Sequence, residues 1–225
     1  MLRAKLALAL VVVLFLAGIG YRVLTVEVPA AGGVYTEAIA GTPIAINPLL
    51  ATFNDADKDL VSLVFSGLTR LGKAGEILPD LAEKWEVDPG GRIYTFSLRK
   101  DVRWHDGNPV TSGDVVFTLN LLRHRDFPGP PELASAWKGV SVEAPDPSTV
   151  RLTLKEPFAP FLTYTTLGVL PEHIFRGTEP GELAKSEYNA SPVGTGPFQF
   201  DSGRLGLVTL KSNPAYHGGG PFISQ

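Results

Sequence analysis

The stretch YTFSLRKDVRWHDGNPVTSGDVVFT, residues 94–118, decides the fold class, because a strand pattern, a turn and a helix pattern follow one another within it. Tyr94, Phe96 and Leu98 alternate with more polar neighbours, which is typical of a strand with one buried face. The extended pattern continues through residues 102–104. The sequence therefore predicts a β-hairpin here, with a helix after it.

The middle of this stretch places His105 beside Asp106, a pair that could belong to a catalytic or metal site. The residue types also suit a turn, since Asp and Asn bond nearby backbone amides and Gly107 can adopt positive φ. Thr111 followed by Asp114 and an apolar run predicts a capping box and a helix over the next twelve or so residues. We therefore interpret the whole cluster as scaffold.

The remaining patterns predict short elements of both kinds. Residues 34–50 alternate as a strand would, residues 57–71 have amphipathic helical spacing, and residues 78–85 predict a short helix. Residues 140–142 and 149–154 predict a second hairpin around a proline-rich turn. The expected fold is a mixed α/β fold with a mainly antiparallel sheet.

Composition excludes several classes of function. The 225 residues carry a net charge of −3 with scattered Lys and Arg, which does not favour a nucleic-acid partner. There is no cysteine, so disulfides and Cys-based zinc sites are excluded. The four histidines are widely spaced, and no metal-binding pair or serine-hydrolase elbow is present. We predict no catalytic residue, no metal and no cofactor.

The N-terminus has the pattern of an export signal or a membrane anchor. Arg3 and Lys5 precede an apolar run that lasts until Arg22. That run is longer than most signal-peptide cores and at the short end for a membrane span. We expect residues 1–30 to be a signal peptide or an uncleaved anchor through residues 6–26, with the rest of the chain outside the cytoplasm.

Four stretches, in order, make the chain resemble a known family. They are INPLL; LVFSGLTRL with GEILPDLAEKW; residues 94–118; and SPVGTGPFQF with NPAYHGGGP. The chain resembles the extracellular solute-binding proteins of ABC importers, family 5, the peptide/nickel-type group, over residues 34–221. One departure is His217, where the family often carries another aromatic residue.

The resemblance implies a two-lobed, type II periplasmic-binding-protein-like fold. Residues 31–225 would be lobe I, truncated before lobe II, and the chain alone would bind its ligand poorly. The implied function is capture of peptides outside the cytoplasm and their delivery to a permease and its ATPase, without catalysis. Nickel chelates and oligosaccharides remain open as ligands. A secreted or anchored peptide hydrolase and a ligand sensor or chaperone on the same fold remain alternatives.

By analogy with the family, three places are expected to face the ligand: the loop after the first strand, the apolar segment before residue 168, and the point where the chain crosses between lobes. The candidate residues are Asn47, Tyr164, Thr165, Thr166, Leu167 and Thr195. Each could equally serve packing alone.

Overall fold

The computed structural model describes residues 10–11, 13–15, 30–51, 54–204 and 206–225. The chain forms two units, Met1–Ala31 and Gly32–Gln225. The predicted signal or anchor falls almost wholly outside the described residues. Among those that are described, no helix is long and apolar enough to span a bilayer.

The second unit is organised around a four-stranded antiparallel sheet with the order β3-β4-β6-β5. Its strands are β3 (Ala82–Val87), β4 (Ile93–Leu98), β5 (Ser141–Asp146) and β6 (Thr149–Thr153). Tyr94, Phe96 and Leu98 are all buried on β4, as their alternation predicts. The predicted second hairpin is confirmed as β5–β6. The expected pairing of residues 102–104 with β4 is wrong, because β4 pairs with β3 and β6 instead.

The short helix predicted over residues 78–85 is also wrong. This segment holds β2 (Ile77–Pro79), which pairs with β1 (Thr69–Leu71), and the first half of β3. The local spacing of apolar residues suits a helix, but pairing with β4 places Trp85 opposite Phe96 and near its ring. Tertiary pairing outweighs local helix propensity here.

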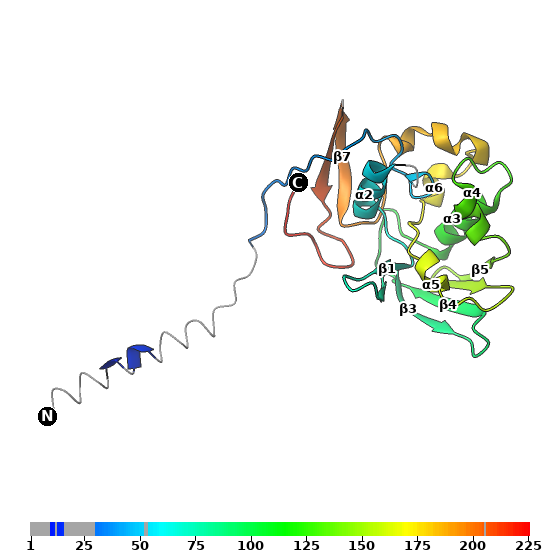
Figure 1. Ribbon diagram of the computed structural model, residues 1–225, viewed down its shortest axis with the longest axis horizontal. Coiled ribbons are helices and arrows are strands. Elements are labelled where there is room, and N and C mark those ends of the chain that lie inside the picture. The colour runs from blue at the N-terminus through cyan, green and yellow to red at the C-terminus, as the bar shows by residue number, and fades with distance from the viewer. Residues whose placement is uncertain (1–9, 12, 16–29, 52–53, 205) are drawn as a thin grey trace. The chain divides into compact units, whose positions relative to one another are not determined.

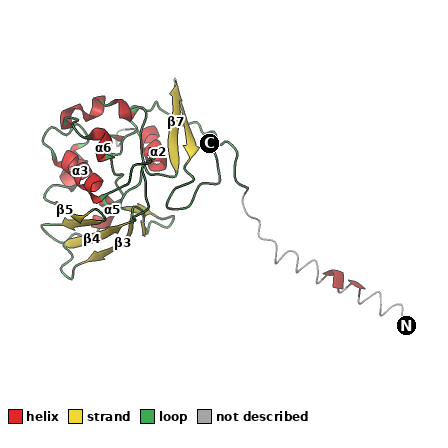
Figure 2. Cartoon of the chain, turned by 180° about the vertical axis from the view of Figure 1, so that it is seen from behind, coloured by secondary structure: helices red, strands yellow, loops and turns green. Residues whose placement is uncertain are grey.

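Helix α3 (Ser112–Arg123) lies over the sheet with α4 (Pro131–Ala136), as Figures 1 and 2 show. Its predicted start is confirmed. The backbone N–H of Thr111 donates to the Asp114 carboxylate at 2.8 Å, which satisfies a donor that the helix cannot pair itself.

Helix α2 (Asp55–Val64) is shorter than the predicted 57–71. It ends because Phe65 is extended and the chain continues into β1. Between them, Gly67 passes so close to Thr166 that a Cβ on the glycine would lie 2.7 Å from its carbonyl carbon. A glycine is required where two backbones approach this closely.

The other elements complete the unit. They are α5 (Phe161–Tyr164), α6 (Glu172–Phe175), the 3-10 turns η2 (Pro180–Lys185) and η3 (Glu187–Asn189), and a hairpin of β7 (Phe198–Arg204) and β8 (Leu207–Ser212). Residues 34–50 form no strand, contrary to the prediction. Their backbone is bonded outside any ladder: Tyr35 N–H donates to Gln225 O at 2.9 Å, and Ile46 N–H donates to Asn189 O at 2.9 Å.

Candidate functional site

His105 connects the β4–α3 segment to the loop containing Thr195. The N–H of Gly194 donates to His105 Nδ1 at 3.2 Å, so Nδ1 carries no proton and Nε2 donates to the carbonyl of Gly196 at 3.1 Å. Both ring nitrogens are occupied by backbone groups. Burial favours the neutral ring and lowers the pKa of His105 below its usual value. This histidine is scaffold, as the turn interpretation predicts.

The two aspartates of the same stretch are also held by structural partners. Burial raises the pKa of Asp106, but hydrogen bonds from His173 (Nε2 to Oδ2, 2.7 Å) and from Asn108 outweigh it, so the pKa lies below its usual value. Asp114 accepts from the backbone of Thr111 and of Glu172, yet its burial dominates and raises its pKa. Neither carboxylate lines either of the two cavities described below.

The three predicted ligand-facing places converge on the chain that leaves α2. Thr165 O accepts from Thr69 N–H at 3.1 Å, and Gly196 N–H donates to Val64 O at 2.8 Å. On the other side, a Cβ on Gly168 would lie 2.9 Å from Pro48. Segments as far apart in sequence as Pro48 and Gly196 thus pack around one short segment.

Asn47 lies inside this junction rather than on its surface. It is 1% exposed, and its amide donates to Asn189 Oδ1 at 2.9 Å while its oxygen accepts from Leu49 N–H at 2.9 Å. Asn189 in turn donates to Leu183 O at 2.8 Å. Both amides therefore have structural partners in this conformation.

Tyr164, Thr165 and Leu167 share one small apolar cavity with Trp137. Its volume of about 20 Å³ suits a single water molecule rather than a ligand. Thr165 is buried and pairs with Thr69 through their hydroxyls at 2.7 Å. Thr166 donates to Thr163 O within its own turn. Tyr164 is partly exposed and stacks on Phe158, with the ring centroids 5.7 Å apart.

Thr195 is buried between two glycines that touch the end of α2. Among the described residues its hydroxyl has no hydrogen-bond partner. A Cβ on Gly194 would lie only 1.8 Å from Val64 O, so this loop is pressed against the helix end. Gly194 and Gly196 therefore serve close packing against the end of α2.

A buried histidine–aspartate pair that sequence reasoning did not identify lies near the same helix end. His217 Nε2 is 2.6 Å from Asp80 Oδ1, and both side chains are almost fully buried. The ring of Tyr216 lies 4.5 Å from that of His217, centroid to centroid, and is tilted by 55° relative to it. Burial together with the Asp80 charge raises the pKa of Tyr216. The only sequence signal was that His217 departs from the family pattern.

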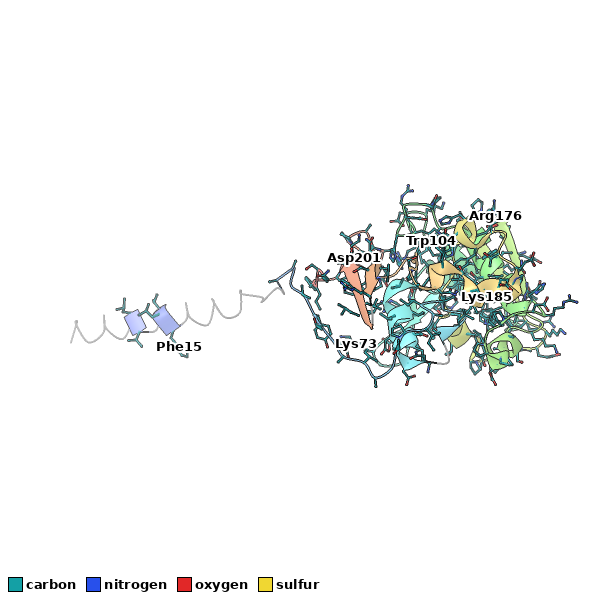
Figure 3. The ribbon with its side chains drawn as sticks, turned by 90° about the horizontal axis from the view of Figure 1, so that it is seen from above. Phe15, Lys73, Trp104, Arg176, Lys185 and Asp201 are labelled. Carbon is teal, nitrogen blue, oxygen red and sulfur yellow. The ribbon has the colours of Figure 1, made fainter. Side chains whose placement is uncertain are left out.

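A second cavity, of about 180 Å³, was also missed. It lies between residues 42–46, η3 and the β7–β8 hairpin (Figure 1). Figure 3 shows this hairpin, marked by Asp201, apart from Trp104 in the body of the fold. The walls come from segments more than 140 residues apart, so no local pattern could reveal the pocket.

Within the described ranges, no three metal-ligating side chains are grouped closely enough to hold an ion.

Comparison with known proteins was made at the level of family, sequence and structure. The model of "Bacterial extracellular solute-binding proteins, family 5 Middle" matches residues 76–225. A Brucella ovis protein named as an ABC transporter peptide-binding protein is 40% identical over 156 residues, which is 68% of this chain and 29% of that protein. The oligopeptide-binding protein AppA of Bacillus subtilis is 30% identical over 200 residues, 87% of this chain and 36% of AppA.

Two solved structures match at similar identity. AppA in complex with a nonapeptide has a TM-score of 0.81 at 30% identity, covering 88% of this chain and 40% of that one. NikZ of Campylobacter jejuni, in complex with Ni(L-His), has a TM-score of 0.69 at 31% identity, covering 85% and 37%. The chain thus spans about a third of the length of the curated relatives it matches.

Proposed function

Because the chain belongs to the bacterial extracellular solute-binding proteins of family 5, we propose that it captures peptides outside the cytoplasm and presents them to an ABC permease driven by an ATPase. The observation that carries the peptide assignment is the match to AppA, whose complex holds a nonapeptide, over 88% of this chain. The relatives named above are binding proteins, and the chain itself would bind without making or breaking bonds.

In this proposal residues 31–225 act as one lobe of a two-lobed protein, which closes on the ligand by a hinge. An extended peptide would lie along the exposed chain before Asn47 and pair with its backbone. Ile44 supports this placement, since it is 79% exposed in a segment that belongs to no helix or strand. The backbone N–H groups of Ile44 and Ala45 donate to the buried Asp57 carboxylate at 2.9 and 3.1 Å, which holds the segment in place.

The six predicted site residues have a reduced part in this proposal. Tyr164 and Leu167 remain candidates for ligand contact, because they are not fully buried. Asn47, Thr165 and Thr195 are buried, so they would not contact the ligand but would fix the shape of the loops that form the binding surface. Thr166 would stabilise the turn after α5. The basic and apolar pattern of residues 1–30 supports export or anchoring of the chain through residues 6–26.

A peptide library separates binding from hydrolysis. The purified chain is immobilised and exposed to mixed peptides of three to nine residues, and the retained material is analysed by mass spectrometry. We expect intact peptides to be enriched over a blank resin. Accumulation of cleaved fragments would support the hydrolase alternative instead. Retention of sugars or nickel chelates in place of peptides would overturn the assignment of the ligand.

A further inference from the structure

The 180 Å³ pocket beside residues 42–46 has the size of one side chain. An apolar cavity of about 150 Å³ holds a benzene molecule, whereas sites for drug-sized ligands are roughly 300–1,000 Å³. The pocket can therefore accept a phenyl or leucyl group, but not a whole dipeptide. If a peptide lies along the neighbouring extended segment, one of its side chains is the natural occupant.

The chemistry of the walls favours an apolar group. Seven of the twelve lining residues have apolar side chains: Pro43, Ile44, Ile46, Ala190, Phe200, Leu207 and Val208. Asn189 also lines the pocket, but its amide is already bonded to Asn47 and Leu183. A polar side chain would find few partners there, so its burial would be unfavourable.

Arg204 is the one charged residue that lines the pocket. It is exposed at the end of β7, and no carboxylate in the described part of the chain lies within salt-bridge distance of its guanidinium. Lys211, by comparison, lies 3.7 Å from Asp201 on the same hairpin. A guanidinium at the rim of an apolar pocket is complementary to a carboxylate attached next to an apolar group.

The C-terminal amino acid of a peptide carries a carboxylate and can carry an apolar side chain, so one residue can satisfy both the rim and the walls of the pocket. We propose that this pocket is a specificity site for the C-terminal residue of the bound peptide: an aromatic or large aliphatic side chain enters the pocket while the terminal carboxylate pairs with Arg204. This inference rests on the proposed function and specifies which peptides the chain prefers.

The test is an NMR titration of the isotope-labelled chain with three tripeptides: Ala-Ala-Phe, Ala-Ala-Phe amide and Ala-Ala-Ala. With Ala-Ala-Phe, the backbone signals of Ile46, Ala190 and Val208 should shift. Replacing Phe by Ala should weaken binding by about tenfold or more, because most of the buried apolar area is lost. Amidation should weaken it about twofold to fivefold, as expected for an exposed charge pair.

Two variants and one matched control test whether Arg204 and the pocket walls cause these differences in affinity. Arg204→Gln should abolish the difference between the acid and the amide while keeping the preference for Phe. Leu207→Asp should weaken Ala-Ala-Phe binding, whereas Leu71→Asp, which changes a similarly exposed leucine on β1, should leave it unchanged. Both leucines are more than half exposed, so neither change should prevent folding.

The outcomes distinguish the inference from the function on which it rests. Shifts confined to residues 164–167, or equal affinity for Phe and Ala peptides, would overturn the pocket assignment and leave peptide binding intact. Equal affinity for acid and amide would overturn the role of Arg204. If no backbone NMR signal of the chain shifted at millimolar peptide, the result would count against the proposed function itself.

Discussion

The Nε2 atom of His105 lies 3.1 Å from the carbonyl oxygen of Gly196, although 91 positions separate the two residues. Together with the Gly194 N–H bond to Nδ1, this contact ties the segment before α3 to the loop that leads into the β7–β8 hairpin. A residue that looks catalytic in the sequence is thus a cross-link between distant parts of the unit.

This cross-link should make stability depend on pH. The folded state lowers the pKa of His105, so its contribution is complete above the unfolded value of about 6.5 and is lost as the pH falls below that value towards the folded pKa. Urea denaturation at several pH values should show a loss between neutral and mildly acidic pH. The loss should be smaller in His105→Gln, whereas His124→Gln, at an exposed histidine, should behave as the wild type. Identical pH profiles for all three proteins would contradict the role of His105.

The buried pair of Asp80 and His217 predicts strong non-additivity. His217→Ala leaves the Asp80 carboxylate buried without its partner, which typically costs about 3–5 kcal/mol. The double variant Asp80→Leu/His217→Phe removes both polar groups and should cost much less. Denaturant unfolding measures His217→Ala, the single variants Asp80→Leu and His217→Phe and the double variant, with Glu182→Gln as the control at an exposed pair worth about 1 kcal/mol or less. Additive losses would show that the two side chains do not act as a pair.

Asn47 and Thr166 should respond differently to truncation. Asn47→Ala removes a buried amide and leaves Asn189 Oδ1 and the Leu49 N–H without partners, so we expect a loss of about 1–3 kcal/mol in the free energy of unfolding. Thr166→Ala removes only a bond within its own turn and should change stability by about 0.5 kcal/mol. Thermal melts compare the two, and equal losses would contradict the buried position of Asn47.

Gly194 should not accept a side chain. A methyl group there would lie 1.8 Å from Val64 O, and the shift needed to relieve this overlap should cost about 1–3 kcal/mol or more. Gly181 is a matched control, because its Cβ would meet only ordinary contacts at 3.6 Å or more. Gly194→Ala should therefore unfold at clearly lower denaturant than Gly181→Ala. Similar midpoints would mean that the loop does not press against α2.

Sequence reasoning predicted the elements whose signals are local. The cap of α3 at Thr111, the alternation along β4 and the proline-rich turn between β5 and β6 each depend on neighbouring residues, and all three are confirmed. The family followed from motifs of the same kind. Residues 78–85 could not be assigned in this way, because their strand exists only through pairing with β4.

The site depends on contacts that no local pattern records. The bond between Asn47 and Asn189 spans 142 positions, and that between Asp80 and His217 spans 137. The pocket with Arg204 likewise forms only when the hairpin meets residues 42–46. Motifs therefore identified the segments around the site. They did not predict which of its side chains are buried and which face solvent.

The central claim is that the chain binds peptides without cleaving them. Equilibrium dialysis of the purified chain against a labelled nonapeptide, followed by mass spectrometry of the peptide, tests this directly. We predict saturable retention of one intact peptide per chain, with weak affinity if residues 31–225 act as a single lobe, as proposed above. No retention at millimolar peptide, or recovery of the peptide only as fragments, would contradict the account.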